Sequence, residues 1–328
     1  LIQQSAAYAY LIYCVISGAI SIGSFAMYTG AVTTFSIAFR NVLDSLIEIQ
    51  TYDIYYDKLD EYLNLPKTLR EGKELIDADR NHIIEFRNVS FQYAGSDVYA
   101  LKNINITIPF GQKLSIVGEN GAGKTTFVKL MTRMYDPTEG EILLDGVNIK
   151  TIDYEQYMSI FSSVFQDYRL FSFSIKDNVA FAQPMDEDKV RDILEYVGFG
   201  EKLRSLQNGI DTSVFKNFDE AGFEPSGGEG QKLALARALY KDAPIVLLDE
   251  PTAAMDPKAE YELYQRFNEM VQGKTAVYIS HRLSSAKFCD VIAVFRNGQI
   301  IEYGTHDELY SKGGLYKALF SMQSQFYR

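Results

Sequence analysis

A glycine-rich loop restricts the fold of this chain more than any other stretch of its sequence. It follows an apolar run at residues 114–117, precedes a segment with helical periodicity, and consists of Gly118, Glu119, Asn120, Gly121, Ala122, Gly123, Lys124 and Thr125. The pattern G-x-x-x-x-G-K-[ST] in this context is typical of a phosphate-binding loop, because glycines let backbone N–H groups turn inward and the helix start adds a partial positive charge. The sequence therefore predicts an α/β domain in which Lys124 reaches the β- and γ-phosphates of a nucleotide and the Thr125 hydroxyl ligates Mg²⁺.

Length and charge exclude several other classes. At about 150 residues per domain, 328 residues predict two units. The 32 basic and 43 acidic residues give a net charge of −11, which argues against a nucleic-acid partner. Two cysteines, Cys14 and Cys289, exclude a disulfide scaffold and fit a reducing compartment. The three histidines, His82, His281 and His306, share no metal-ligand spacing, so we expect no zinc site.

The first part of the chain has a different composition. Residues 1–39 contain no charged side chain and no histidine, and Arg40 is the first charged residue. A helix needs about 20 apolar residues to cross the hydrocarbon core, so this stretch is too long for one span and slightly short for two. Small and polar residues at 17–24 indicate a reversal, and we predict a truncated span over about 1–17 and a full span over about 24–40. A buried helix pair in a soluble protein is the alternative.

Charged residues then alternate with apolar ones. Apolar side chains recur every three or four positions over residues 40–63, which predicts an amphipathic helix continuing out of the membrane. Pro66 ends this pattern. We therefore divide the chain into a helical part at 1–65, a polar linker at 66–81 and an α/β domain at 82–328.

Short apolar or alternating runs predict the strands of this domain. Runs that are apolar on both faces are typical of a parallel sheet covered by helices. Strands are expected at 84–91, 104–108, 114–117, 141–144, 245–248, 277–280 and 291–295, and helices at 190–197 and 232–240.

Two further motifs carry chemistry. The apolar run at 245–248 ends in Asp249 and Glu250, which are suited to hold Mg²⁺ and to polarise a water that attacks the γ-phosphate. Ser226, Gly227 and Gly228 stand directly before a helix and indicate a second anion site, with an ordinary capped helix as the alternative. Two anion sites can close on one nucleotide only if they meet, within one chain or between two.

With these motifs, the sequence resembles the nucleotide-binding domain of an ATP-binding cassette (ABC) transporter, preceded by the end of an exporter-type membrane domain. Residues 118–125 match the Walker A motif, 245–250 match Walker B, and 225–229 stand where the signature motif is expected. The resemblance implies a P-loop fold with a helical subdomain at about 168–240. It also implies further membrane helices before Leu1. Because Leu1 is not Met, we expect the chain to be a fragment, a processed product or a trimmed form of a longer protein.

The resemblance also assigns roles to single residues. It implies that Tyr93 stacks on adenine, that Gln166 contacts Mg²⁺ and the attacking water, and that His281 contacts the γ-phosphate. Residues 253–256 resemble the D-loop and 304–309 a C-terminal stretch common in exporters. The implied catalytic residues are Glu250, His281 and Gln166, and the implied metal ligands are Thr125, Gln166 and Asp249. The implied nucleotide contacts are Tyr93, residues 118–125, Thr126, Ser226, Gly227 and Gly228.

The signature region departs from the family pattern. Pro225 replaces the usual leucine, and Glu229 replaces the usual glutamine, which brings a negative charge near a phosphate site. The segment at 211–224, which in the family faces the membrane domain, is also longer than in typical exporters. We expect activity in spite of these differences.

The resemblance implies an ABC exporter half-transporter that hydrolyses ATP with Mg²⁺. Two chains, identical or not, would enclose two ATP molecules, and the substrate would be an unidentified peptide, lipid or drug. The membrane part would lie in lipid and the nucleotide-binding domain in the cytoplasm. The alternatives are a partner chain with little turnover of its own and a soluble, non-transport ABC ATPase. A kinase or small GTPase would share only the phosphate loop, and neither class explains the second predicted anion site at residues 226–228.

Overall fold

The chain forms two compact units, Leu1–Lys67 and Thr68–Arg328, and each is described by itself. The computed structural model describes residues 2–64, 72–77, 81–181, 183–249, 265, 268–269, 271–279, 283 and 285–326.

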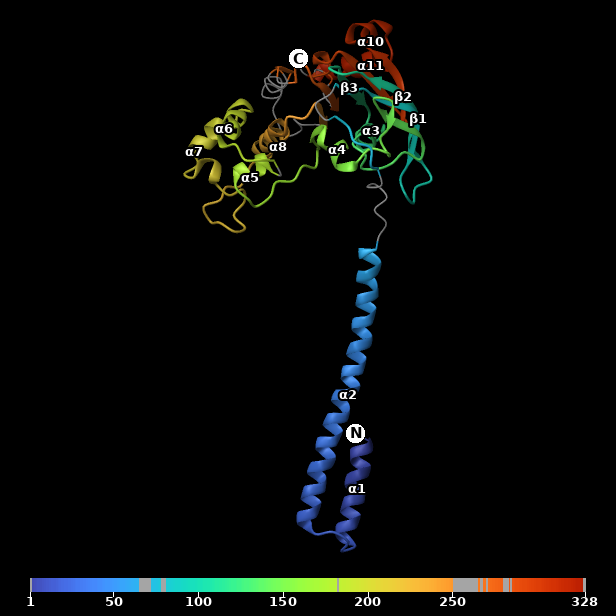
Figure 1. Cartoon of the computed structure of the whole chain (residues 1–328), viewed down its shortest axis with the longest axis vertical. Coiled ribbons are helices and arrows are strands. Elements are labelled where there is room, and N and C mark those ends of the chain that lie inside the picture. The colour runs from blue at the N-terminus through green and yellow to red at the C-terminus, as the bar shows by residue number, and fades with distance from the viewer. Residues whose placement is uncertain are drawn as a thin grey trace. The chain divides into compact units, whose positions relative to one another are not determined.

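The first unit is a helical hairpin (Figure 1). It consists of α1 (Ile2–Ile16) and α2 (Ile22–Leu63), and the reversal lies where the small and polar residues predicted it. Ser21 is the N-cap of α2, and its hydroxyl accepts a hydrogen bond from the Ser24 N–H. The helix runs without a break from the apolar segment into residues 40–63, as the periodicity predicted.

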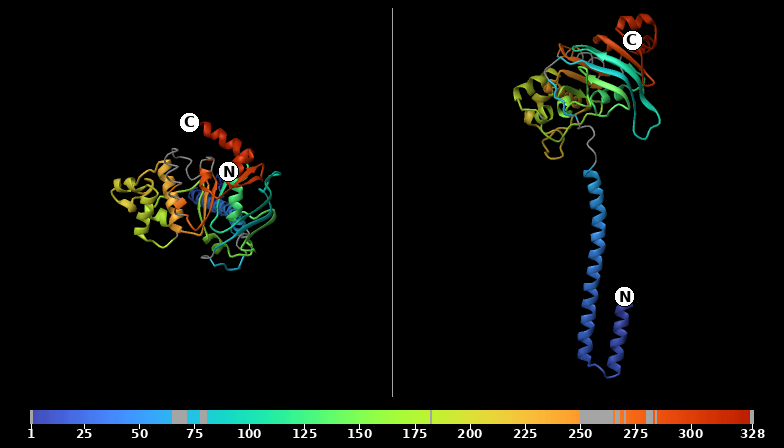
Figure 2. Two further views of the ribbon diagram at one scale, coloured as in Figure 1. Left: turned by 90° about the horizontal axis from the view of Figure 1, so that it is seen from above. Right: turned by 45° about the vertical axis from the view of Figure 1, so that its right-hand side comes forward.

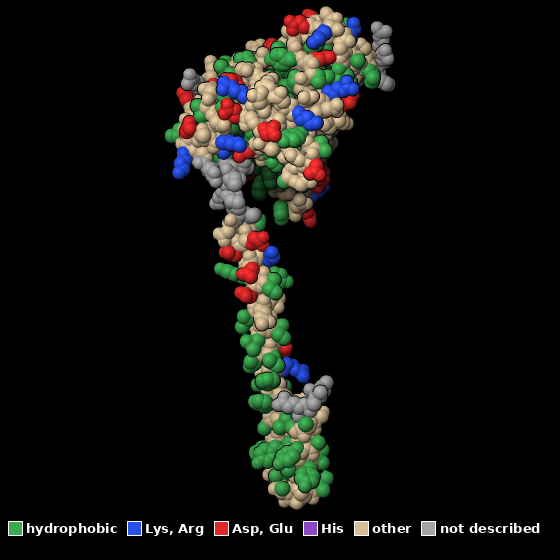
Figure 3. All heavy atoms as spheres, turned by 90° about the vertical axis from the view of Figure 1, so that its right-hand side faces the viewer, with side chains coloured by type: hydrophobic (Ala, Val, Ile, Leu, Met, Phe, Trp, Pro, Cys, Tyr) green, Lys and Arg blue, Asp and Glu red, His purple; other side chains and the backbone are tan. Residues whose placement is uncertain are grey.

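The hairpin exposes apolar side chains. None of the side chains of α2, all of which the structure describes, is buried within this unit. Apolar side chains cover much of the hairpin surface in Figure 3, and acidic ones gather in the last third of α2. By length and hydropathy α2 is able to cross a membrane, whereas α1, at about 22 Å, is shorter than a hydrocarbon core of about 30 Å.

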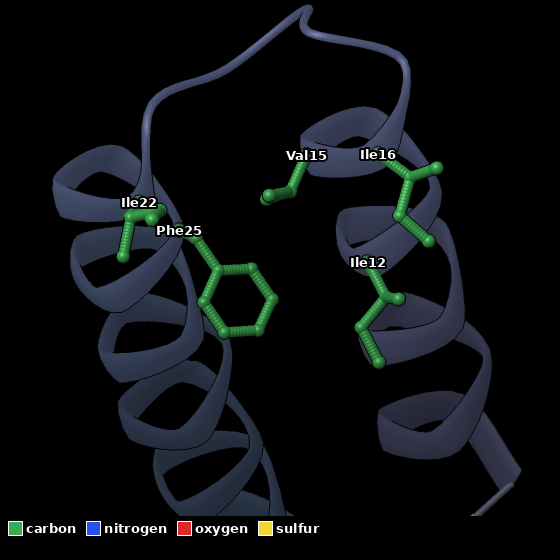
Figure 4. A pocket seen from close by; sticks show the side chains of 5 residues that line it. All are labelled: Ile12, Val15, Ile16, Ile22 and Phe25. Atoms are coloured by element: carbon green, nitrogen blue, oxygen red, sulfur yellow. The ribbon is translucent and has the colours of Figure 1, made fainter.

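The two helices leave a small gap beside the reversal. A cavity of about 140 Å³ lies between them, and Val15 and Phe25 point into it (Figure 4). Its lining is apolar and consists of Ile12, Val15, Ile16, Ile22 and Phe25. Because water needs polar partners, this gap is suited to an apolar group.

Within its described residues, the second unit contains two sheets. A four-stranded antiparallel sheet has the order β2-β1-β4-β5, and a six-stranded sheet has the order β10-β9-β3-β8-β7-β6, with parallel pairing from β9 through β6. The strands are β1 (Ile84–Gln92), β2 (Tyr99–Ile108), β3 (Lys113–Gly118), β4 (Glu139–Leu144), β5 (Val147–Asn148), β6 (Phe161–Val164), β7 (Ile245–Asp249), β8 (Thr275–Ile279), β9 (Val291–Arg296) and β10 (Gln299–Gly304). The parallel strands that the apolar runs predicted are therefore confirmed.

Helices surround these sheets. Helices α5 to α8 form a group at one side of the unit, and α10 and α11 lie at another (Figure 1 and Figure 2). The helices are α3 (Lys124–Met131), α4 (Tyr154–Ser159), α5 (Ile175–Ala180), α6 (Glu187–Tyr196), α7 (Gly200–Ser205), α8 (Gly227–Lys241), α10 (His306–Lys312) and α11 (Leu315–Phe326), with short 3₁₀ turns at Gly209–Asp211 and Ser285–Phe288.

Aromatic packing fixes the position of α3 between the sheets. The Phe127 ring of α3 stacks on Phe86 of β1 at 4.4 Å and meets Phe295 of β9 edge-on at 5.6 Å. All three side chains are buried, so the loop that precedes α3 is attached to a rigid base.

Part of the predicted linker belongs to the second unit and is hydrogen-bonded within it. The backbone N–H groups of Lys73 and Glu74 donate to the Thr151 carbonyl at 2.8 and 2.9 Å, and the Ile76 N–H donates to Gln156 Oε1 at 2.9 Å. The polar composition gave no sign of these contacts, because backbone groups make them. Residues 65–71 and 78–80 lie outside the described residues.

Candidate functional site

The glycine-rich loop connects β3 to α3 in a conformation that only glycine adopts easily. Gly118 and Gly123 have φ values of +150° and +104°. A Cβ atom would lie 2.3 Å from the Phe295 carbonyl oxygen at Gly118 and 2.8 Å from the Ala100 carbonyl oxygen at Gly123. The loop is therefore pressed against both sheets, and its backbone shape is set before any ligand arrives.

Lys124 lies at the first position of α3, and its side chain folds over the loop. Its ammonium donates to the carbonyl oxygens of Gly118 and Glu119, both at 2.9 Å, and the residue is only 6% exposed. A phosphate held by the loop would meet this cation directly, because the ammonium carries three donors.

A cavity of about 400 Å³ opens beside the loop. This volume lies in the range of about 300–1,000 Å³ that small-molecule sites occupy. The residues that line it are Tyr93, Ala100, Asn120, Gly121, Gly123, Lys124, Thr125, Thr126 and Gln166. Apart from Ala100 of β2, each of them was singled out from the sequence, and the fold brings them together from the end of β1, the loop, α3 and the segment after β6.

Tyr93 is fixed at the edge of this cavity. Its hydroxyl lies 3.1 Å from Thr126 Oγ1, and its ring meets Phe91 and Tyr135 edge-on at 4.8 and 5.3 Å. The sequence gave no signal for Tyr135, which is 41% exposed and lies after α3. Together these contacts hold the Tyr93 ring in one orientation, as a stacking partner for a flat base requires.

The parallel register places the carboxylate motif at the same edge of the sheet as the loop. Ile116 of β3 and Asp249 of β7 both pair with Ile279 of the strand between them. On the next strand, Val164 of β6 pairs with Leu248 of β7. The residues that follow each strand therefore emerge side by side.

Residues with oxygen groups suited to a hard cation lie at the end of β7 and in the segments that line the cavity. Thr125 and Gln166 line the cavity, and Asp249 is 2% exposed at the end of β7. Hydroxyl, amide and carboxylate oxygens are the ligands that Mg²⁺ prefers, so these residues fit that ion. Glu250 and His281, and residues 253–256 of the D-loop-like stretch, lie outside the described residues.

The second predicted anion site is the start of α8. Ser226 is the N-cap: its hydroxyl accepts from the Glu229 N–H at 3.3 Å, and Glu229 Oε2 accepts from the Ser226 N–H at 2.8 Å. The first N–H groups of a helix have no intrahelical acceptor, so those of Gly227 and Gly228 point outward from the helix start. The capped-helix alternative and the anion-site hypothesis are thus compatible.

The structure shows which groups balance the charge of Glu229. Its carboxylate turns back onto the Ser226 backbone, and the Lys202 ammonium lies 3.2 Å from Oε1. Partial burial opposes ionisation, but the hydrogen bonds from Ser226 and the Lys202 charge outweigh it and lower the pKa of Glu229. Pro225 precedes the N-cap, where no helical hydrogen bond is required of its nitrogen.

The segment after Gln166 is tied to α8 at two places. The Tyr168 hydroxyl donates to the Gly227 carbonyl at 3.1 Å, and Arg237 Nη1 donates to the Arg169 carbonyl at 2.9 Å. Burial raises the pKa of Tyr168, which keeps its hydroxyl protonated as a donor. The sequence gave no signal for Tyr168, because its partner is a backbone carbonyl of a distant helix.

The long segment at 211–224 folds back on itself. The Phe215 N–H donates to the Phe223 carbonyl at 2.8 Å, and the Asn217 amide donates to Ser172 Oγ at 2.8 Å. Phe218 at its tip is 87% exposed. The segment therefore carries an exposed aromatic side chain.

Fold and site together define a class of protein. A glycine loop between a buried parallel strand and a helix, with a carboxylate-bearing strand at the same sheet edge, is the arrangement of a P-loop nucleotide-binding domain. Residues 101–253 match the family model described as "ABC transporter". This chain therefore carries the nucleotide-binding domain of an ABC transporter, as the motif order predicted.

Known proteins extend the similarity beyond this domain. The subtilin transport ATP-binding protein SpaT of Bacillus subtilis is 36% identical over 309 residues, which cover 92% of this chain and 50% of the relative. The ATP-dependent lipid A-core flippase of Burkholderia orbicola (strain AU 1054) is 40% identical over 242 residues, 74% of this chain and 40% of the relative. The chain spans about half the length of the curated relatives it matches, or less.

A solved structure is similar over nearly the whole chain. It is described as a bacterial Atm1-family ABC exporter with ATP bound. The match has a TM-score of 0.78 at 27% identity and covers 98% of this chain and 56% of the solved one. The chain is thus similar to ABC exporters in both its helical hairpin and its nucleotide-binding domain.

Proposed function

We propose that this chain is the ATP-binding and ATP-hydrolysing part of an ABC exporter. One observation carries the proposal: the 400 Å³ cavity gathers a fixed aromatic ring, a glycine loop with a buried lysine and the amide of Gln166. These groups are far apart in the sequence but line one cavity. They are suited, in turn, to a base, to its phosphates and to the water that attacks the γ-phosphate.

Each group has a defined task in this proposal. Tyr93 would stack on the adenine, and the loop N–H groups and Lys124 would hold the β- and γ-phosphates. Thr126, which lies 3.1 Å from the Tyr93 hydroxyl, would contact the nucleotide beside that ring. Thr125, Gln166 and Asp249 would hold Mg²⁺, which neutralises charge on the β- and γ-phosphate oxygens when bound.

Two residues complete the chemistry of the site. Glu250 orients and deprotonates the attacking water, and His281 donates a hydrogen bond to the γ-phosphate. Their assignment rests on the motifs of the sequence.

A second chain completes the site. Ser226 and Gly227 are exposed at the start of α8, so their donors are available to a nucleotide held by another chain. Two half-transporters, identical or different, would therefore enclose two ATP molecules, and their closure would be passed to the membrane helices.

The substrate is proposed as a peptide, a lipid or a drug. One relative is named for subtilin transport and another as a lipid A-core flippase, and the second name supports a lipid substrate. The apolar exposed surface of α2 supports a location in a membrane, with the nucleotide-binding domain in the cytoplasm.

ATP turnover tests this proposal. The intact protein in lipid nanodiscs, with its natural partner if the partner differs, should hydrolyse ATP in a Mg²⁺-dependent way. The Glu250→Gln variant should lose at least about a hundredfold of this rate, because a general base typically contributes 10²–10⁴-fold.

The exposed Glu155→Gln variant on α4 serves as the control and should keep the parental rate. Equal rates for Glu250→Gln and the parent would show instead a chain that holds ATP for a catalytic partner. Recovery of the intact protein without membranes or detergent would favour a soluble ABC ATPase.

A further inference from the structure

Lys202 occupies an unusual place beside the start of α8. It belongs to α7, and its ammonium lies 3.2 Å from Glu229 Oε1 and 5.5 Å from the centre of the Phe223 ring. Phe223 is 7% exposed, and its ring lies 6.1 Å from that of Phe199. The lysine is therefore held between a carboxylate and an aromatic face, and it joins α7, the 211–224 segment and α8 at one point.

The carboxylate at this point poses an electrostatic problem. Glu229 is in the first turn of α8, whose outward N–H groups are suited to an anion. An ionised carboxylate there favours helix formation, but it also repels any phosphate that approaches the same turn. Because the pKa of Glu229 is lowered, the carboxylate carries its charge at neutral pH.

The geometry removes most of this repulsion. One carboxylate oxygen is directed to the Ser226 N–H, and the other faces the Lys202 ammonium. The two side chains are 24% and 36% exposed, so solvent screens the pair only in part. The net charge of the pair is zero, which leaves the helix dipole as the field that an incoming phosphate meets.

We propose that Lys202 is a positioning residue for ATP hydrolysis. Lys202 cancels the charge of Glu229, so that the start of α8 accepts the γ-phosphate held by the second chain. The proposal rests on the proposed function, because it needs a nucleotide shared between two chains. Lys202 touches neither the nucleotide nor the water and acts through Glu229.

The test is a charge-deletion cycle in the intact protein in nanodiscs. Lys202→Met should raise the KM for ATP about threefold to tenfold, because it restores an unbalanced charge beside the phosphate, and should change kcat less. Glu229→Gln removes the repelling charge, so the double variant Lys202→Met/Glu229→Gln should return to the KM of Glu229→Gln alone. Lys202→Arg should keep the parental KM.

Two readouts separate this role from a structural one. Raising the salt concentration should reduce the Lys202→Met defect, since salt screens the partly exposed charge of Glu229. ADP binding should be unchanged, because ADP has no γ-phosphate to reach α8.

Lys189→Met is the matched control. Lys189 also lies over an aromatic ring, that of Tyr240 at 4.8 Å, and donates to the Tyr240 carbonyl, which lies near the other end of α8. This variant should keep the parental KM.

The outcomes distinguish this inference from the proposed function. A parent with Mg²⁺-dependent turnover and a Lys202→Met variant with parental KM would overturn the inference alone, and so would a double variant that stays impaired. If Lys202→Met does not fold, a parental KM in Lys202→Gln, or a loss in Lys202→Arg, overturns it. A parent without turnover overturns the proposed function and this inference with it.

Discussion

The two predicted anion sites of this chain are built in opposite ways. In the glycine loop, a Cβ atom at Gly123 would strike Leu101 and Ala100 within 2.8 Å, and Lys124 is buried. At the start of α8, a Cβ atom at Gly228 would meet nothing within 4 Å. Tertiary packing shapes the first site and a local cap shapes the second, so the first is preformed inside the domain and the second is open to its surface.

The largest expected effect tests the buried lysine. Lys124→Ala removes an ammonium able to make two charge-assisted hydrogen bonds to phosphate, each of about 1.5–3 kcal/mol, so ATP affinity should fall at least about a hundredfold. Equilibrium binding of a fluorescent ATP analogue measures this. Lys129→Ala, on the same helix, is the control. If only Lys129→Ala lost affinity for ATP, the role of Lys124 as the phosphate-binding lysine would be contradicted.

The next effect concerns the shape of the loop. Gly123→Ala places a methyl group against the Ala100 carbonyl oxygen at a φ of +104°, so we expect a loss of about 2–4 kcal/mol in local stability. Hydrogen exchange at β3 and α3 reports this loss. Gly121→Ala has a positive φ but open space around its Cβ, and should cost about 1 kcal/mol. Equal costs for the two would mean that tertiary contact does not shape the loop.

The matching change at α8 should separate stability from activity. In Gly228→Ala the new methyl group meets no atom of this chain, so stability should stay the same or rise by about 0.5–1 kcal/mol. ATP turnover of the assembled exporter should fall about tenfold or more, because the methyl group would face the phosphate of the second chain. Unchanged turnover would remove the start of α8 from the proposed site.

The smallest effect compares two helix caps of the same kind. Ser226 caps α8 and Thr305 caps α10, each in a box closed by a glutamate. Replacing either by Ala should cost about 1 kcal/mol of stability. Only Ser226→Ala should also slow ATP turnover, which a steady-state assay measures. Equal turnover in both variants would show that Ser226 only caps the helix.

Local chemistry explains why so much of the fold could be predicted. The glycine loop, the buried parallel strands and the helix starts are each encoded within a few neighbouring residues, since backbone freedom, apolar periodicity and capping act over short distances. The structure therefore confirmed the strand and helix around residues 118–125 and the reversal between α1 and α2.

Contacts between distant segments explain what could not be predicted. The approach of Tyr93 to Thr126 and Tyr135 and the bond of Tyr168 to Gly227 join residues that share no local pattern. The roles of the site residues stay predictions, and Glu250 and His281 lie outside the described residues.

By itself, the sequence determined that this chain has a phosphate loop on an α/β scaffold and an uncharged helical stretch before it. Only the tertiary structure decided how the charge of a glutamate in the first turn of α8 is balanced, because Lys202 reaches Glu229 from another helix. The physical reason is that a charge is specified by one residue, whereas its effect depends on what the fold places beside it.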